Sequence, residues 1–221
     1  MSQLAPCGRT PLHSHFARFQ DFTSLHSGHL TSVYLAPHTT SCYYYSMLQP
    51  AWDEIEKLYL LPGADPATIS QFQNLKSSQS SHTKHERNPL HYCAFFLPYD
   101  KNAGQIYLGH HKKADDWIPP GGHIEEGETP SDTAVREAKE ELGIDITKDQ
   151  LQAFSLSVKF IGCPDVGCMA HYDIWHFIHV RVQDFDYLKS EYYDARWFSI
   201  QDGIKQITKN DDFATIIAKS I

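Results

Sequence analysis

The sequence predicts an α+β domain of about 130 residues, in which helices are layered on a sheet, preceded by a smaller and mostly helical N-terminal region. Two observations support this prediction. From residue 89 onward, strand-like segments alternate with helical patterns. Before that point the composition differs, because no Asp, Glu, Lys or Arg occurs between Phe22 and Trp52. We therefore divide the chain into residues 1–88 and residues 89–221.

Length and composition are those of an ordinary globular protein. The chain has 221 residues, of which 41% are hydrophobic and 21% charged, so one large domain or two small ones are expected. The strongest apolar runs, Ala94–Leu97 and Leu58–Leu61, are far shorter than the roughly 18 residues that a membrane helix needs. The first ten residues lack the apolar core of a secretory signal. We expect a cytoplasmic protein with no membrane partner.

The net charge and the cysteines indicate which partners and which thiol state to expect. The formal charge is −8 at pH 7, which argues against duplex DNA as a partner because like charges repel at long range. A small polyanionic substrate remains compatible, since a bound divalent cation reverses the local sign of the field. The cysteines are few and odd in number, which favours reduced thiols over a disulfide framework. They are Cys7, Cys42, Cys93, Cys163 and Cys168.

The N-terminal region is predicted to hold two short strands and a helical hairpin. Aromatic and β-branched residues favour strands at Thr31–Leu35 and Cys42–Ser46. Two helices follow within residues 50–76, the first after Pro50 and the second capped by Asp65. Their apolar residues recur at helical spacing. These are Trp52, Ile55, Leu58 and Tyr59 in the first helix, and Ile69, Phe72 and Leu75 in the second. Residues 76–88 are polar and are interpreted as a linker.

The role of residues 1–88 is open between a cap over a functional site, a homodimer interface and a separate small domain. The aromatic run Tyr43–Tyr45 fits a base-stacking platform, a dimer surface or internal packing, and internal packing is the favoured interpretation.

Residues 89–221 are predicted to form the larger domain. Its expected strands are Leu90–Leu97, Gln105–His110, Leu151–Ile161, Tyr172–Val182 and Ala195–Phe198, the first two paired as a hairpin. A closing helix is expected at Asp212–Lys219. Thr129–Leu142 has the clearest helix signals, because Thr129 and Asp132 match a capping box and Gly143 can end the helix in a left-handed conformation.

Three glutamates share one face of this predicted helix. Glu137, Glu140 and Glu141 stand at positions i, i+3 and i+4, which places their carboxylates side by side. The apolar residues of the helix fall on another face; they are Ala134, Val135, Ala138 and Leu142. Three such charges repel one another unless a cation lies among them, and Mg²⁺ accepts carboxylates together with substrate phosphates. The spacing therefore predicts a metal site.

Residues on either side of the glutamates support the same prediction. Gly121 and Gly122 permit close backbone approach, so that a main-chain carbonyl can turn toward an ion. An ion pair between Glu128, just before the helix, and Arg136, within it, would tie the loop to the helix. A metal site needs such partners to orient its ligands.

The stretch from Gly122 to Ile144 resembles a Nudix box. The box reads Gly, five residues, Glu, seven residues, Arg-Glu, an aliphatic residue, any residue, Glu-Glu, any residue, Gly and an aliphatic residue. Its fixed positions are matched by Gly122, Glu128, Arg136, Glu137, Glu140, Glu141, Gly143 and Ile144, with Ala138 a small choice at its aliphatic position. The resemblance covers residues 89–221 and leaves residues 1–88 outside it.

The resemblance implies a Nudix-type α/β/α sandwich with a mixed β-sheet. It also implies hydrolysis of a nucleoside diphosphate linked to another moiety, with Mg²⁺ or Mn²⁺ as cofactor. The implied catalytic set is Glu128, Arg136, Glu137, Glu140 and Glu141, and the implied metal ligands are Gly121, Glu137, Glu140, Glu141 and Glu191. Glu137 would either ligate metal or position and deprotonate the attacking water.

Other candidates near the box are weaker. The resemblance implies one more acidic ligand before the strand at Ala195–Phe198, where Glu191 is retained and Asp194 competes with it. Three basic residues are candidates for contact with substrate phosphates, against the alternative of surface or packing roles. They are His111, Lys113 and His123.

A cysteine pair in the second half of the chain resembles half of a zinc site. Cys163, Cys168 and His171 are close in sequence, but zinc needs four ligands and usually tighter cysteine spacing. His176 or His179 could supply a fourth ligand. An ordinary loop with reduced thiols is the favoured alternative.

The substrate is the least specified feature. A nucleoside triphosphate or a sugar nucleotide is the favoured substrate. The alternatives are a catalytically silent nucleotide-sensing or regulatory module and an RNA 5′-end pyrophosphohydrolase. The second alternative is disfavoured by the net charge, because no long basic stripe is present to hold RNA.

Overall fold

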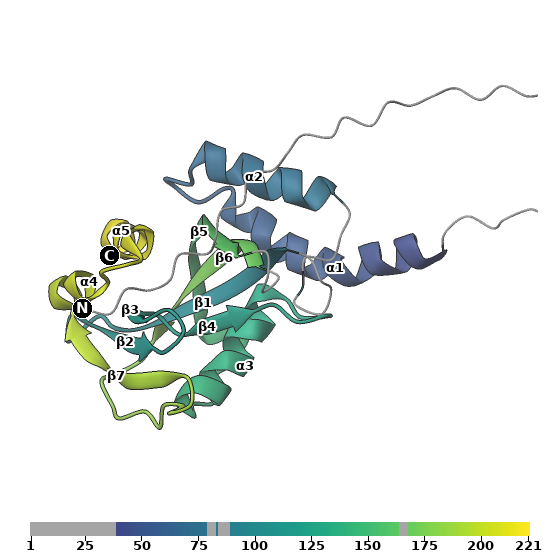
Figure 1. The fold of residues 1–221 in the computed structure, drawn as a ribbon. Helices are drawn as coiled ribbons and strands as arrows, with labels where there is room; N and C mark the ends of the chain where they lie inside the picture. The colour runs from purple at the N-terminus through teal and green to yellow at the C-terminus, as the bar shows by residue number, and fades with distance from the viewer. Residues whose placement is uncertain (1–38, 79–82, 84–88, 164–167) are drawn as a thin grey trace, which may run out of the picture.

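A mixed β-sheet with helices on both faces forms the body of the protein (Figure 1). The computed structural model describes residues 39–78, 83, 89–163 and 168–221. The strands are β1 (Leu90–Asp100), β2 (Gln105–His111), β3 (Asp116–Ile118), β4 (Gly121–His123), β5 (Leu151–Cys163), β6 (Cys168–His179) and β7 (Tyr192–Ser199). The helices are α1 (Thr39–Leu58), α2 (Pro66–Ser77), α3 (Pro130–Leu142), α4 (Ile200–Gln206) and α5 (Asp211–Ser220), with a 3₁₀ turn at Lys148–Gln150. The α+β class is confirmed.

The sheet is mixed because its central strand has neighbours of both directions. The main order is β3-β2-β1-β6-β5, with β4 paired to β1 and β7 paired to β2. β1 runs parallel to β6 over ten residue pairs, from Leu90 opposite Ala170 to Tyr99 opposite His179. Its other neighbours, β2 and β4, are antiparallel to it. Both faces of β1 are covered, and its residues are accordingly almost all buried.

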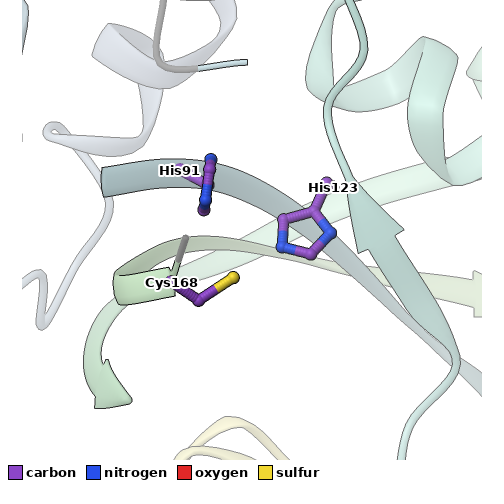
Figure 2. Close-up of side chains that lie close together, drawn as sticks. All are labelled: His91, His123 and Cys168. Carbon is purple, nitrogen blue, oxygen red and sulfur yellow. The ribbon is translucent and has the colours of Figure 1, made fainter. Parts of the chain in front are cut away.

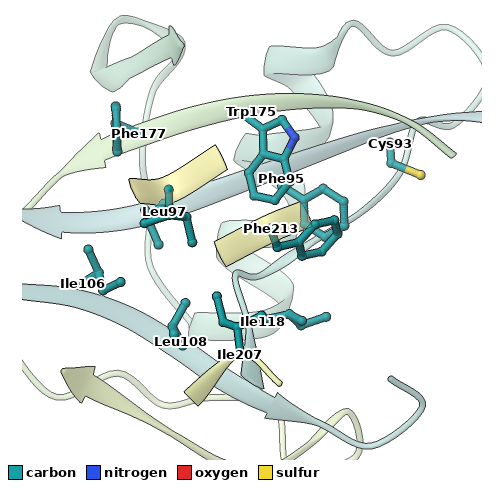
Figure 3. Packing of buried hydrophobic residues seen from close by; sticks show 11 residues of the cluster. Cys93, Phe95, Leu97, Ile106, Leu108, Ile118, Trp175, Phe177, Ile207 and Phe213 are labelled. Atoms are coloured by element: carbon teal, nitrogen blue, oxygen red, sulfur yellow. The ribbon is translucent and has the colours of Figure 1, made fainter. Parts of the chain in front are cut away.

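Alternate residues of β1 enter different cores, as the two-residue period of a strand requires. Phe95 and Leu97 belong to the core beneath α4 and α5, together with Trp175 and Phe213 (Figure 3). Phe96 lies on the opposite face, in the core with α3. Tyr92 and Ala94 lie in a third core, which the N-terminal helices cover. That core includes Ile55 and Leu58 of α1, Phe72 and Leu75 of α2, and Ile124 and Ile174.

One expected strand in the N-terminal region is wrong. The segment Cys42–Ser46 is part of α1, which continues through Pro50 instead of beginning after it. A proline inside a helix is unfavourable, but Trp52 and Ile55 of the same helix are almost fully buried against the rest of the protein. Tertiary packing thus overrides the local preference for a strand. The expected strand at Thr31–Leu35 and most of the expected linker at 76–88 lie outside the described residues.

The remaining helix predictions agree with the structure. α2 begins at Pro66, and Asp65 caps it by accepting a 2.9 Å hydrogen bond from the Thr68 amide. α5 is one residue longer at each end than expected. None of the helices in the described residues combines the length and apolar character that crossing a membrane requires.

Strand boundaries and short elements differ from the expectation. β6 begins at Cys168 and ends at His179, where Tyr172–Val182 was expected, and β7 begins three residues early at Tyr192. β3, β4 and α4 were not expected, because three residues are too few to show a period and α4 has a single buried residue, Gly203.

Candidate active site

Helix α3 is fixed at both ends by the signals in its sequence. The Thr129 hydroxyl accepts from the Asp132 amide, and the Asp132 carboxylate accepts from the Thr129 amide, which completes a capping box. Gly143 ends the helix with φ at 68°, and its amide bonds back to Lys139. The helix packs Ala134, Ala138 and Leu142 against the sheet. Its acidic face is thereby directed toward β4.

Arg136 is the centre of a charged network on this face. Its Nε lies 2.7 Å from Glu128 Oε1, and its Nη2 lies 3.1 Å from Glu128 Oε2. Its Nη1 donates to Glu137 Oε1 at 2.8 Å and to Glu140 Oε2 at 3.3 Å. Nη2 also donates to the His123 carbonyl at 3.2 Å, which links the network to β4. One guanidinium therefore contacts three carboxylates and the backbone of β4.

Glu128 is held as a charged group. Besides Arg136, it accepts hydrogen bonds from the Thr133 hydroxyl at 2.7 Å and the Glu125 amide at 3.1 Å. Partial burial by itself raises the pKa of Glu128, but the hydrogen bonds from Arg136 and Thr133 outweigh it and lower the pKa below the usual value. Glu128 thus stays ionised and anchors Arg136.

The three glutamates of α3 differ in environment. Glu140 is half exposed, whereas Glu137 is largely covered and Glu141 is buried. Burial raises the pKa of Glu137. Burial and then the charge of Glu137 raise the pKa of Glu141 to about 8, although a hydrogen bond from the Gly121 amide opposes the shift. The site is therefore short of positive charge, and a cation would relieve that shortage.

The three carboxylates are not gathered around one point in this structure. Arg136 Nη1 lies between Glu137 and Glu140, while Glu141 faces the Gly121 amide at 2.9 Å. Among the described residues, the groups of ligand atoms that all lie within 4.8 Å of one another are centred on His123 and include none of these glutamates. A shared ion would require Glu137 and Glu140 to turn away from Arg136. Oxygen donors of this kind suit Mg²⁺ or Mn²⁺.

β4 brings the glycines against both the central strand and the helix. Gly121 has φ at 150°, and a Cβ there would overlap the carbonyl oxygen of Ala94 in β1. A Cβ on Gly122 would overlap Glu137 Oε1. Gly121 needs glycine because fixed backbone atoms occupy the space of a side chain, whereas at Gly122 a side chain would displace the end of Glu137.

The loop before β7 forms the opposite wall of the site. Glu191 Oε2 lies 3.2 Å from His111 Nε2, and its Oε1 lies 4.0 Å from Lys113 Nζ. The loop is held in place by hydrogen bonds from the Lys112 amide to the Glu191 carbonyl at 2.8 Å and from the Leu188 amide to the Glu141 carbonyl at 2.7 Å. Asp194, the competing acidic residue, pairs with Arg196 at 3.4 Å.

These residues surround one pocket of about 420 Å³. All predicted metal ligands and all three predicted phosphate contacts line it; they are Gly121, Glu137, Glu140, Glu141, Glu191, His111, Lys113 and His123. Arg136 and Glu128 stand behind this lining and orient it. Burial lowers the pKa of His111, against the opposing charge of Glu191. A volume of this order is typical of small-molecule sites, which span roughly 300–1,000 Å³.

Several pocket residues were missed by sequence reasoning. The Tyr192 hydroxyl donates to the Glu141 carboxylate, and the ring of Tyr192 occupies the space that a side chain at Gly109 would need. Lys159 lines the pocket from β5 and pairs with Asp212 at 2.7 Å. Asn210 is positioned by Asp116, which accepts from both its amide and its side chain. No local motif marks these residues, because the sheet assembles them from distant segments.

The expected half zinc site is rearranged. Cys168 and His171 lie near His123, not near the histidines proposed as a fourth ligand. His176 is buried beside the Phe95 carbonyl at 3.3 Å, and His179 contacts Gln152 at 2.8 Å. The backbone of Cys163 ends β5 opposite Cys168, and its side chain is outside the described part of the structure.

Comparison with known proteins identifies the family to which the chain belongs. The family model described as NUDIX domain matches residues 89–219. The E. coli dihydroneopterin triphosphate pyrophosphohydrolase is 19% identical with a TM-score of 0.51, over 58% of this chain and 92% of that chain. A MutT protein from Methanosarcina mazei Go1 is 16% identical with a TM-score of 0.50, over 60% and 93%. An Ap4A hydrolase from C. elegans is 25% identical with a TM-score of 0.45, over 57% and 93%. The first two share the fold of the sheet and its helices.

Proposed function

The chain belongs to the Nudix family of pyrophosphohydrolases, and we propose that its pocket hydrolyses the diphosphate bridge of a nucleoside diphosphate linked to another moiety. A nucleoside triphosphate or a sugar nucleotide is the favoured substrate. The observation that carries the proposal is that Glu137, Glu140 and Glu141 all line one pocket, with Arg136 and Glu128 behind them.

Glu140 and Glu141 are proposed to hold Mg²⁺ or Mn²⁺, with the carbonyl of Gly121 and with Glu191 from the opposite wall. The carboxylate donors suit a hard divalent cation, and the pKa of Glu141 is raised by burial and then by the nearby charge of Glu137, which a cation would offset. When bound, such a cation neutralises charge on the diphosphate and lowers the pKa of a coordinated water.

Glu137 is proposed to position the attacking water and accept its proton. Burial raises the pKa of Glu137, which moves the carboxylate toward the range in which a general base works well near neutral pH. Arg136 Nη1, 2.8 Å from Glu137 Oε1, would restrain the carboxylate as it receives the proton.

Basic groups on the far wall are proposed to bind the phosphates. His111 and Lys113 flank Glu191, and Lys113 is largely exposed at the pocket mouth. The exposed ammonium can draw an anionic substrate toward an otherwise acidic site. The pocket also includes Phe95 and Phe213, which give it an apolar part suited to a base or another ring.

A substrate panel tests the proposal. The full chain is incubated with Mg²⁺ or Mn²⁺ and with a nucleoside triphosphate, an ADP-linked sugar or a dinucleoside polyphosphate, and the products are separated by chromatography. We expect a nucleoside monophosphate or a phosphorylated product from at least one substrate. Glu140→Gln and Glu141→Gln should reduce the rate by about 100-fold or more, since each removes a proposed ligand.

Glu126→Gln is the matched control, because Glu126 is an exposed glutamate in the loop before α3. It should retain the wild-type rate. Equal rates in the wild type and both ligand variants would contradict the proposal. A ligand that raises the melting temperature without any turnover would favour the nucleotide-sensing alternative instead.

A further inference from the structure

A second cluster of metal-ligating side chains lies beside the glutamate site. It consists of His91 and Cys93 of β1, His123 of β4, and Cys168 and His171 of β6. The sheet register assembles most of it, because His91 is opposite His171 and Cys93 is opposite His123. Directly opposed residues project to the same face of a sheet. Segments far apart in the sequence thus place imidazoles and thiols together.

The ligand atoms in this cluster form two triads, each compact enough to hold one ion. Those of His91, His123 and Cys168 all lie within 4.8 Å of one another, and so do those of Cys93, His123 and His171. Figure 2 shows the sulfur of Cys168 directed toward the ring of His123, with the imidazole of His91 beside them. His123 belongs to both groups and is their common point.

One distance matches metal coordination closely. His123 Nε2 and His171 Nε2 face each other at 3.3 Å. Two imidazoles bound to a tetrahedral zinc at about 2.0–2.1 Å hold their nitrogens about 3.4 Å apart. The two rings are nearly perpendicular, at 89°, so they face each other without stacking.

We propose that His91, His123 and Cys168 bind one zinc-class transition metal ion, separate from the ion held by the glutamates, and that His171, now close to His123 alone of these three, turns in as the fourth ligand. Three nitrogens and one sulfur complete a tetrahedral shell. Cys93, the other thiol, is almost fully buried and is grouped with His123 and His171 but not with His91 and Cys168, so it is not a ligand in this assignment.

The donor chemistry separates the two sites. Imidazole and thiolate select zinc and related transition ions, whereas carboxylates select Mg²⁺ or Mn²⁺. The two sites are nevertheless connected, because the His123 carbonyl accepts a hydrogen bond from Arg136 at 3.2 Å. An ion at His123 would fasten β4, which carries Gly121 and Gly122, to β1 and β6. Its role is thus to hold the glycine strand in place against α3.

Cobalt titration tests the assignment on the full chain. The protein is stripped with a chelator, kept reduced, and titrated with Co²⁺, whose thiolate charge-transfer absorption reports a Co–S bond. We expect one equivalent of Co²⁺ per chain with this absorption, displaced by one equivalent of Zn²⁺. Excess Mg²⁺ should not displace it. Failure of the wild type to bind Co²⁺ with a thiolate band would overturn the proposal.

Four variants identify the ligands and distinguish this site from the glutamate site. Cys168→Ser should abolish the band, and His91→Ala should weaken Co²⁺ affinity by more than the roughly ten-fold that loss of a supporting residue costs. The matched controls Cys93→Ser and His179→Ala, on the same strands, should bind as the wild type does. A band that persists in Cys168→Ser or vanishes in Cys93→Ser would overturn this ligand set.

Failure here is distinguishable from failure of the proposed hydrolase. Glu140→Gln removes a proposed ligand of the first site and should leave the Co²⁺ band intact. Loss of the band in that variant would show that the thiol and the glutamates share one ion, which would overturn the claim of a separate site. The substrate panel measures hydrolysis and not Co²⁺ binding, so neither outcome for the Co²⁺ band decides whether the chain is a hydrolase.

Discussion

The guanidinium of Arg136 donates hydrogen bonds to both carboxylate oxygens of Glu128, with Nε 2.7 Å from Oε1 and Nη2 3.1 Å from Oε2. This two-pronged contact joins the loop before α3 to the second turn of the helix. The remaining nitrogen, Nη1, then has a fixed direction toward Glu137 and Glu140. The position of the acidic face is therefore set by a residue that stands behind the pocket lining.

Arg136→Lys is expected to lower activity while leaving the protein folded. A lysine ammonium cannot form the planar two-pronged contact, so Glu128 loses one partner and Glu137 loses its restraint. We expect a rate about 10–100-fold lower and a free energy of unfolding lower by about 1–3 kcal/mol. Urea denaturation and steady-state kinetics measure the two effects.

Lys139→Gln is the control for this prediction. Lys139 lies on the same helix, and its pair with Asp145 is exposed, so its loss should change stability by about 0.5 kcal/mol or less. An Arg136→Lys variant as active as the Lys139→Gln variant would show that Arg136 does not orient the glutamates.

Gly121 and Gly122 are expected to fail in different ways when replaced by alanine. A Cβ on Gly121 would overlap backbone of the central strand, so Gly121→Ala should unfold easily, with about 1–3 kcal/mol lost to the left-handed backbone alone. A Cβ on Gly122 would overlap only the end of the Glu137 side chain. Gly122→Ala should therefore stay folded and lose activity, because Glu137 is displaced.

The Gly104→Ala variant separates the effect of backbone strain from the effect of steric overlap with neighbouring atoms. Gly104 also has a positive φ, at 64°, but nothing lies within 4 Å of the position of its Cβ. Melting temperatures should fall in the order wild type, Gly104→Ala, Gly121→Ala. If Gly122→Ala is fully active, the contact between β4 and Glu137 is not needed for the reaction.

Divalent metal is expected to stabilise the folded protein through Glu141. The pKa of Glu141 is raised to about 8 from an ordinary 4.5, so stability from its protonated form is lost progressively as the pH rises from 4.5 to 8. At pH 8.5, Mg²⁺ should raise the melting temperature of the wild type, by an amount equivalent to about 2.7 kcal/mol at 100 times its dissociation constant. Glu141→Gln should lose most of this metal-dependent shift.

A second prediction concerns the stability of Glu141→Gln at pH 8.5. Without metal, Glu141→Gln should be as stable as the wild type or more so, because the buried charge is gone. Glu126→Gln, at an exposed position, should keep the wild-type response to Mg²⁺. A metal response in Glu141→Gln equal to that of the wild type would argue against Glu141 as a ligand.

The parts of the site that could be predicted from sequence are local. Glu128, Arg136 and the three glutamates lie within fourteen consecutive positions, so helix geometry and capping are enough to relate them. The same holds for the ends of α3: the caps Thr129 and Gly143 and the last residue, Leu142, agree with the prediction, and the helix begins one residue later than expected.

The parts that could not be predicted depend on strand register. His91 faces His171 across eighty positions, and Tyr192 reaches Glu141 from the start of β7. Pairing between distant strands is set by which hydrophobic residues are buried together, and one sequence does not fix it. The prediction of a strand at Cys42–Ser46 was wrong for a related reason. Burial of α1 on the sheet outweighs the strand preference of these residues.

Acid should destabilise the protein through His176, a residue outside both proposed metal sites. His176 is 2% exposed, and burial lowers its pKa from 6.5 to about 4. Between these two values the unfolded chain binds a proton that the folded protein does not. The free energy of unfolding therefore falls as the pH falls from 6.5 toward 4, by up to about 1.4 kcal/mol per pH unit from this group.

His176→Gln should flatten that dependence, because glutamine does not titrate and can still donate to the Phe95 carbonyl that His176 Nδ1 contacts at 3.3 Å. Urea denaturation at pH 7, 6, 5 and 4.5 gives the slope for each protein. His179→Gln is the matched control, since His179 is exposed on the same strand and should leave the wild-type slope in place. Equal slopes for His176→Gln and the wild type would mean that acid acts elsewhere, and that the buried imidazole is protonated without cost.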